Sequence, residues 1–559
     1  MTAPSVSPAD GDDRSARARA SLTLAAGTLT SRILGFVRTF LLAVTIGTVN
    51  AADAFGVANQ LPNTMYQLTA GGVLTAVLVP QIVQATRSAD GGSAYINRIS
   101  TLAIMLFTAS AAVLTLCSPL LIALYTHDWP ADRVALATAM AYLCMPQVFF
   151  YGLYALLGGV LNARSVFGPY TWAPVANNLI AIAGLAAFLL IYGADSTGVV
   201  PIEDWAGGRT LLLAGSATIG VAAQALILFV FWRKANIRFR PDFTFRHVGL
   251  GATFVAAGWI LANVVIEAIV GLVQSNVLTF ASADRAAGDV ALIGNQGMSY
   301  VFLVYVLPHS IIAVSIATVY FTRFSHWWST GDLASFRADF SRSTRMIGVA
   351  SVFCTAALIV LSFSIVRMFT THSFAQVSAM AGILIPMSFG LVAYSFFFLT
   401  MRALYAVDDT RSVFVITAIS AAVRIPAYFA AGLLNPYWIA SGIAVATTTA
   451  CWIEAIAGFV ILRRRIGAPG GFVIVRTHVR LLLAAAGASV AGWAVSFLLG
   501  AYRADGFGNA TIPGALLTVV LAGSVMAGVY VVFLRVLRVQ ELDAMVWLIR
   551  ARLPHRGLG

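Results

Sequence analysis

Two arginines in the first long apolar segment are the side chains best suited to bind a ligand inside a membrane. Arg32 and Arg38 stand in the stretch SRILGFVRTFLL. An arginine at the centre of a membrane span costs about 2.5–3.5 kcal/mol on insertion scales, so its side chain must meet protein, water or a ligand. Because a guanidinium group matches carboxylate or diphosphate oxygens bidentately, the two arginines predict a binding site for an anionic headgroup.

The spacing of these arginines decides how one ligand reaches both. On a straight helix they are about 9 Å apart along the axis and about 120° apart around it. Gly35 stands between them, and a bend there would turn both toward one cavity. In the structural alternative, Arg32 extends to the inner membrane surface or pairs with a carboxylate such as Glu267.

A second polar group lies in a later apolar segment, GWILANVVIEAIVGLVQSN. Glu267 is four residues after Asn263 and seven before Gln274, so the three side chains share one helix face. An ionisable residue at membrane depth is by default a functional candidate. The stripe predicts a proton or cation coupling site, or a partner for the arginines of the first span.

The other ionisable groups indicate structure rather than chemistry. Arg424 and Glu454 fall in neighbouring apolar segments and are expected to form a structural pair, and His309 is expected to be a hydrogen-bonded helix residue. The sequence contains no Walker loop, H-E-x-x-H or G-x-S-x-G motif, and its four cysteines form no C-x-x-C motif. We therefore expect a protein that is not an enzyme, needs no metal or cofactor, and does not use ATP.

Long apolar helices must position these residues, and the composition of the chain indicates that such helices are present. Of 559 residues, 59% are hydrophobic and 10% are charged, against about 45–50% and about 25% in soluble domains. A spanning helix needs about 20 mostly apolar residues. We expect an all-α polytopic membrane protein with about 14 transmembrane helices, at residues 22–47, 54–85, 97–125, 134–161, 169–192, 209–232, 250–281, 291–322, 345–369, 375–403, 411–434, 438–462, 478–500 and 512–535.

The basic residues orient these helices. With a cytoplasmic N-terminus, 27 of the 35 Lys and Arg residues fall in inside segments and five in outside segments. The positive-inside rule then places both termini in the cytoplasm. Nucleic acid is the alternative partner for such basic loops, but topology together with attraction to anionic membrane lipids explains the pattern without it. We expect membrane lipids, and no nucleic acid, as partners.

Two short motifs recur at nearly the same spacing. Residues 163–167 (ARSVF) resemble residues 410–414 (TRSVF), and Leu61-Pro62-Asn63 corresponds to Leu307-Pro308-His309. Each offset, 247 and 246 residues, spans six predicted helices, so both halves share one orientation. Parallel repeats are typical of transporters with a substrate site between the halves. Pro62 and Pro308 bend their helices either statically or as hinges or gates between the lobes.

The predicted organisation has five parts. They are a disordered cytoplasmic tail at 1–20, an N-lobe of six helices at 21–235, a C-lobe of six helices at 236–466, two extra helices at 467–538, and an amphipathic cytoplasmic tail at 539–559.

Several motifs occur together along the chain. They are SRILGFVR at 31–38, DAF at 53–55, NQLPN at 59–63, VP at 79–80, GVLNAR at 159–164, AP at 173–174, NN at 177–178, RALYA at 402–406 and DTR at 409–411. In this set the chain resembles the murein-precursor flippase family (MurJ/MviN), actinobacterial type, of the multidrug/oligosaccharidyl-lipid/polysaccharide exporter superfamily.

The resemblance implies translocation of lipid II, a polyprenyl-diphosphate-linked precursor of the cell wall, from the inner to the outer leaflet of the cell membrane. It implies that Arg32 and Arg38 meet the diphosphate, and that the two extra helices form a groove for the lipid tail. The other residues that the family's motifs single out are Asp53 and Asn63 for the substrate, and Arg164, Arg402, Asp409 and Arg411 in the two lobes.

The chain departs from the family's pattern at two places. After Pro62 many relatives carry arginines where this chain has Tyr66 and Gln67, and before Pro308 they often carry charged residues where it has Phe302, Leu303 and Val306. Two other functions remain open: export of another polyprenyl glycan or a drug, with Glu267 as proton site, and a non-transporting scaffold that binds cell-wall synthesis proteins.

Overall fold

The computed structural model describes residues 8–71, 93–164, 166, 168–198, 200–234, 239–244, 254–282, 289, 291–370 and 373–541, and every regular element in these ranges is a helix. Twelve helices in this part of the chain are long and apolar enough to cross a membrane. The bent pair Phe374–Ser388 and Leu391–Ala406 makes a thirteenth span. These thirteen spans confirm the expectation of an all-α protein with about 14 spans. The remaining predicted span, 54–85, extends beyond the described residues.

The expected disordered tail is partly wrong. The first helix, α1, runs from Pro8 to Ile46, so residues 8–20 are helical. Proline suits the first turn of a helix, and the alanines and arginines that follow are strong helix formers. The predicted amphipathic segment after residue 540 lies almost entirely outside the described residues.

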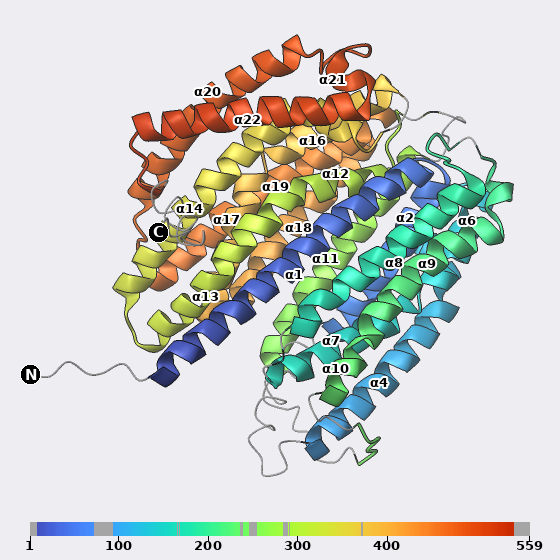
Figure 1. Ribbon diagram of the computed structural model, residues 1–559, viewed down its shortest axis with the longest axis horizontal. Helices are drawn as coiled ribbons and strands as arrows, with labels where there is room; N and C mark the ends of the chain where they lie inside the picture. The colour runs from blue at the N-terminus through green and yellow to red at the C-terminus, as the bar shows by residue number, and fades with distance from the viewer. Residues whose placement is uncertain are drawn as a thin grey trace, which may run out of the picture. The chain divides into compact units, whose positions relative to one another are not determined.

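The first compact unit comprises residues 1–268. Within it, α8 packs along both α1 and α9, α2 packs on α6, and α4 packs on α7 (Figure 1). Its elements are α1, α2 (Ala51–Tyr66), the π-helical turn η1 (Gln67–Gly71), α4 (Ser93–Leu116), α5 (Ser118–Tyr125), α6 (Ala131–Cys144), α7 (Gln147–Ala163), α8 (Gly168–Tyr192), η3 (Ile202–Trp205), α9 (Gly208–Leu226), α10 (Leu228–Lys234) and the first half of α11 (Phe254–Ala281).

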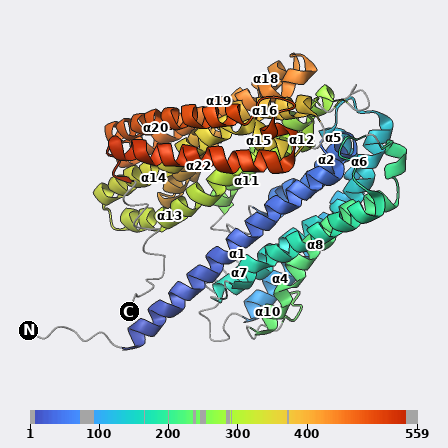
Figure 2. The ribbon, with the colours of Figure 1, turned by 45° about the horizontal axis from the view of Figure 1, so that its top comes forward.

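The second compact unit comprises residues 269–559. The C-terminal helices α20 and α22 pack on each other, and α20 packs on α14 (Figure 2). The elements are the rest of α11, α12 (Asn295–Pro308), the π-helical turn η5 (His309–Ala313), α13 (Val314–Ser329), α14 (Leu333–Val360), α15 (Ser362–Arg367), α16 (Phe374–Ser388), α17 (Leu391–Ala406), α18 (Thr410–Gly432), α19 (Pro436–Ile466), α20 (Gly471–Leu498), α21 (Phe507–Ala510) and α22 (Ile512–Val536).

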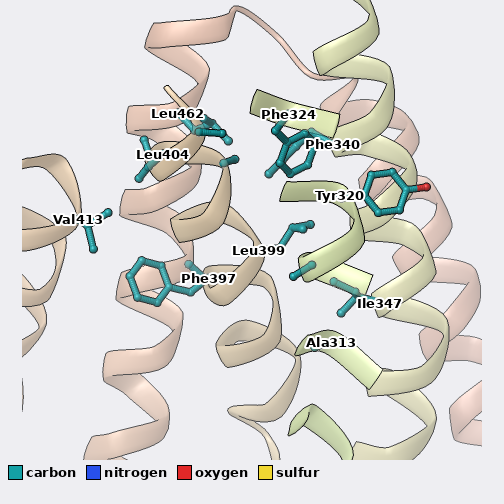
Figure 3. Packing of buried hydrophobic residues seen from close by; sticks show 14 of the residues in the cluster. Ala313, Tyr320, Phe324, Phe340, Ile347, Phe397, Leu399, Leu404, Val413 and Leu462 are labelled. Carbon is teal, nitrogen blue, oxygen red and sulfur yellow. The ribbon is translucent and has the colours of Figure 1, made fainter. Parts of the chain in front are cut away.

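Aromatic packing fills the interior of the second unit between α13, α14 and α17. Phe324, Phe336 and Phe340 are fully buried, and the Phe324 and Phe336 rings stack with centroids 4.8 Å apart. Figure 3 shows Phe324 and Phe340 close together, with Leu399 and Ile347 further along the same cluster. Offset ring pairs of this kind stabilise beyond the area they bury.

Polar caps begin several of the helices. The carboxylate of Asp332 accepts a hydrogen bond from the Ser335 backbone N–H at 2.9 Å at the start of α14, and Asp409 accepts one from Ser412 at 3.1 Å at the start of α18. These bonds satisfy N–H groups that a helix leaves unpaired. The Ser335 N–H also holds the pKa of the Asp332 carboxyl below its ordinary value.

Close packing between α8 and α9 depends on Gly184. A methyl group added there would overlap the side chain of Ser216, whereas one added at Gly258 of α11 meets no atom within 4 Å. We expect Gly184→Ala to lower the free energy of unfolding by about 1–3 kcal/mol. Gly258→Ala should leave it unchanged or raise it by up to about 1 kcal/mol. Thermal unfolding in detergent measures both, and equal stability of the two variants would show that the α8–α9 contact is not tight.

Candidate functional site

Helix α1 presents one face to α8 along the segment that carries the two arginines. The Asn178 side-chain amide donates a hydrogen bond to the Ser31 carbonyl at 2.9 Å, and a Cβ on Gly35 would lie 3.7 Å from that amide. Gly35 thus lies where the two helices approach closely, and α1 runs unbroken from Pro8 to Ile46. The bend suggested for Gly35 stays a prediction.

Arg38 lies at the polar interior of the first unit. The residue as a whole is half-buried, and its guanidinium lies near the Tyr151 phenol of α7. The Tyr151 hydroxyl donates to Gln147 at 3.2 Å, and its ring lies 5.9 Å from that of Tyr66. We name these four residues, Arg38, Tyr66, Gln147 and Tyr151, the Arg38 cluster.

Neighbouring helices fix the Arg38 cluster in place. The Gln147 amide donates to the Thr218 hydroxyl of α9 at 2.9 Å and to Asn59 of α2 at 3.4 Å. The cluster therefore combines one cation with phenol and amide groups drawn from α1, α2 and α7. Such groups suit an oxygen-rich anion, because the guanidinium donates in a fork and phenols donate or accept.

Sequence reasoning missed Gln147 and Tyr151. Their sequence signal was weak: two polar side chains, four residues apart, directly after Pro146 in an otherwise apolar helix. Only the folded structure shows that Tyr151 lies near Arg38 and that Gln147 bonds to Tyr151 and to side chains of α2 and α9.

The other residues predicted for the substrate lie in different settings. Arg32 is half-buried, and Asn63 is exposed near the end of α2. Asp53 is completely buried in the first turn of α2. A carboxylate there is stabilised by the positive end of the helix, so its burial favours a role in anchoring α2 over direct contact with a ligand.

The polar stripe of α11 is present on a continuous helix. Glu267 is exposed, Gln274 is half-buried, and the buried Oδ1 of Asn263 has no hydrogen-bond partner among the described residues. The boundary between the two compact units falls directly after residue 268. An exposed carboxylate halfway along a spanning helix requires a polar surrounding, because hydrocarbon would penalise it.

The two proline motifs lead into the same uncommon backbone. Pro62 is followed by the π-helical turn Gln67–Gly71, and Pro308 directly by the π-helical turn His309–Ala313. Such turns are rare and often lie at functional sites. His309 itself is buried, with Nδ1 3.0 Å from the Ser395 hydroxyl and its ring against Tyr394, as expected of a hydrogen-bonded helix histidine.

The motif residues of the second unit hold helix ends together. Asp409 caps α18 and pairs with Arg465 of α19 at 2.9 Å. Arg402 lies over the ring of Phe398 at 5.0 Å, and Arg411 is exposed. In the first unit, Arg164 follows directly after α7. The contacts of Arg402 and Asp409 favour structural roles for those two residues.

The predicted pairing of Arg424 with Glu454 inside the second unit is confirmed, and its structural role stays a prediction. Arg424 of α18 and Glu454 of α19 are both about nine-tenths buried and lie 3.9 Å apart. Among the residues that the structure describes, no group of His, Cys, Asp and Glu side chains is arranged to hold a metal ion.

Known proteins similar to this chain include lipid flippases along most of its length. A protein of Rhizobium meliloti (strain 1021) named "Probable lipid II flippase MurJ" is 28% identical over 482 residues, covering 83% of this chain and 84% of the relative. One of the same name from Thermotoga maritima is 25% identical over 526 residues, covering 94% and 97%.

Solved structures share the fold. A lipid II flippase MurJ in an inward closed conformation has a TM-score of 0.68 and 20% identity, covering 92% of this chain and 99% of that one. An inward-facing MATE family multidrug transporter of the MOP superfamily has a TM-score of 0.56 and 14% identity, covering 78% and 99%. These likenesses show that the helices are arranged as in that superfamily.

The family model described as "Lipid II flippase MurJ" matches residues 42–506. The match begins after Arg38, so a substrate-binding role for Arg32 and Arg38 is supported by their surroundings in the fold and not by the family model. It nevertheless covers more than half of the chain, in agreement with the fold. The chain is a multi-span membrane protein that belongs to the lipid II flippase MurJ family.

Proposed function

We propose that the chain moves lipid II from the cytoplasmic to the outer leaflet of the cell membrane, with both of its termini in the cytoplasm. The observation that carries the proposal is an arginine within a spanning helix, Arg38, near the Tyr151 phenol that is hydrogen-bonded to Gln147, in a chain of this family. The basic residues concentrated in the expected inside segments support the orientation. No covalent step is part of the proposal.

The headgroup is held by its diphosphate. Arg38 is proposed to bind it together with Arg32, while the hydroxyls of Tyr66 and Tyr151 bind further oxygens. Asn63, exposed near the end of α2, offers an amide to the same headgroup. Tyr66 stands where the family resemblance leads us to expect an arginine, so recognition here is proposed to rely more on neutral hydrogen bonds than on charge.

The polyprenyl tail is proposed to stay in the bilayer beside α20 and α22. Both helices expose apolar side chains along their length, among them Phe472, Val490, Val520 and Val532. In a membrane, lipid hydrocarbon can cover this apolar surface without a free-energy penalty. An isoprenoid chain is also a hydrocarbon, so it can cover the same surface equally well. The headgroup alone therefore crosses polar surroundings.

The membrane potential is proposed to drive net export, while the π-helical turns beside Pro62 and Pro308 let each lobe change shape during alternating access. An inside-negative potential favours outward movement of an anion by about 2.3 kcal/mol per charge per 100 mV. Depletion of the protein tests the substrate directly: lipid II should accumulate on the inner leaflet, and accumulation of a different lipid-linked precursor would reassign it.

Glu267, with Asn263 and Gln274, remains the candidate for ion coupling, and its substitution separates the two energy sources. If the potential suffices, Glu267→Gln keeps translocation within about twofold, because the amide has the shape of the carboxylate without its charge. Translocation into proteoliposomes, with and without a potassium-diffusion potential, measures this. Loss of transport in the variant under full potential would show that the carboxylate carries a coupling proton or cation.

A further inference from the structure

A basic pocket lies at one end of the C-terminal helices, outside the site described above. It has a volume of about 170 Å³ and lies between the start of α20, α14 and the residues that follow α22. Its lining includes four arginines, Arg345, Arg476, Arg480 and Arg538, and one carboxylate, Glu541. We name these five residues and Phe472 the α20 pocket.

The charges of the α20 pocket are unbalanced. Arg345 and Glu541 pair at 2.8 Å, which leaves Arg476, Arg480 and Arg538. Within the described part of the chain, none of these three has a carboxylate partner. Arg476 and Arg480 stand one helical turn apart on α20, where two like charges repel. Three convergent guanidinium groups are stabilised when an anion binds between them.

The backbone after α22 holds Arg538 toward the pocket. Arg538 adopts a left-handed conformation, with φ of +52°, in a turn closed by the Val539 N–H donating to the Leu534 carbonyl at 3.0 Å. The guanidinium of Arg480 donates a hydrogen bond to the Arg538 backbone carbonyl at 3.4 Å. The buried side chains of Val539 and Glu541 fix the segment that follows Arg538. The fold therefore brings the backbone of Arg538 beside Arg480, and both residues line the pocket together with Arg476.

The pocket lies at the level expected of lipid headgroups. It opens beside the first turn of α20, a membrane-spanning helix, where Phe472 is 80% exposed and next to the arginines. Arginines near the end of a span, with apolar side chains beside them, are typical of binding to the phosphates of one leaflet. On the proposed orientation that leaflet is the cytoplasmic one.

From this geometry we infer that the α20 pocket binds the phosphate of an anionic phospholipid, with Arg476, Arg480 and Arg538 around the phosphate and Phe472 against an acyl chain. The volume supports a phosphate with its glycerol, because drug-sized ligands already require about 300–1,000 Å³ and a sugar–peptide headgroup is larger still. Bound there, the lipid would fasten α20 and the end of α22 to α14. The inference stands apart from the proposed transport function.

Native mass spectrometry of the purified full chain tests the inference, with phosphatidylglycerol and phosphatidylcholine added separately. We expect the unaltered protein to retain phosphatidylglycerol preferentially. The double variant Arg476→Ala/Arg480→Ala should bind it about 25-fold more weakly, which is about fivefold for each charge removed. Because both side chains lie at the surface end of α20, Arg476→Lys/Arg480→Lys provides a folded variant that keeps the charge and should lose no more than about fivefold.

The control removes two arginines that lie outside the pocket. Arg463 and Arg464 are exposed at the end of α19, and Arg463→Ala/Arg464→Ala should retain phosphatidylglycerol at the unaltered level. Equal loss in both alanine variants, or no preference for phosphatidylglycerol in the unaltered protein, would overturn the inference. Pocket-dependent binding of undecaprenyl diphosphate but not of phosphatidylglycerol would also overturn it, since the pocket would then take the transported lipid.

Discussion

Arg38→Ala is expected to reduce lipid II translocation about 150-fold while the protein still inserts into the membrane at its normal level. Removing one partner of a buried, hydrogen-bonded charge pair costs about 2–5 kcal/mol, and about 3 kcal/mol corresponds to this factor. The loss is large because the diphosphate must leave water, and the remaining groups of the Arg38 cluster are neutral. An assay of lipid II accessibility on the outer leaflet measures the effect.

Two further variants define what Arg38 contributes. Arg38→Lys keeps the charge without the planar fork and should retain about a tenth of the activity. Tyr151→Phe removes the hydroxyl that donates to Gln147 and should lose about tenfold or less, since a neutral hydrogen bond is weaker than a charged one. Full translocation by Arg38→Ala at normal expression would show that the headgroup passes without this arginine.

Glu454→Ala is expected to lower the free energy of unfolding by about 3–5 kcal/mol. It removes the carboxylate that lies 3.9 Å from the buried guanidinium of Arg424 and leaves that charge without this compensation between α18 and α19. The unfolding temperature in detergent should fall accordingly, and the variant should accumulate poorly in cells.

The double variant Arg424→Leu/Glu454→Leu separates stability from function. Replacing a buried ion pair by apolar side chains of similar volume is often neutral or stabilising, so its unfolding temperature should return to about that of the unaltered protein. If the double variant is as unstable as Glu454→Ala, the pair is not isolated, and its loss disturbs the wider polar interior near Tyr305. If it is stable but inactive in translocation, the pair serves transport.

The positions of the spans follow from the chain alone, because a length of about 20 apolar residues is a local property. The predicted segment 169–192 is α8 at 168–192, and the predicted segment 512–535 is α22 at 512–536. The ends of other spans are predicted less well: the predicted segment 345–369 is α14 at 333–360, and the predicted segment 375–403 is the bent pair α16 and α17. The Arg424–Glu454 pair was predictable for a related reason: opposite charges in neighbouring spans cannot be left apart in hydrocarbon. The helical start at Pro8 was missed because a polar composition is compatible with both helix and disorder.

The surroundings of the charges could not be predicted in the same way. Arg38 and Tyr151 are 113 residues apart, and Arg345 and Arg476 of the α20 pocket are 131 residues apart. Asp53 belongs to a motif that the family resemblance linked to the substrate, yet the folded chain buries it completely. Which side chains meet depends on how each helix is rotated about its axis and on which helices pack beside it. An apolar sequence constrains both weakly, because several faces of each helix are similarly hydrophobic.

The sequence by itself determined that this chain is a polytopic helical membrane protein, where its helices run, and that Arg38 must find a polar partner. Each of these depends on transferring a residue from water to hydrocarbon, a cost set by residue type and position along one segment. Only the tertiary structure decided that Arg38 faces Tyr151, that Asp53 is completely buried, and that three arginines line one pocket beside α20. Those outcomes depend on which helix faces pack together, and packing inside a membrane is set by shape and hydrogen bonding between segments distant in the chain.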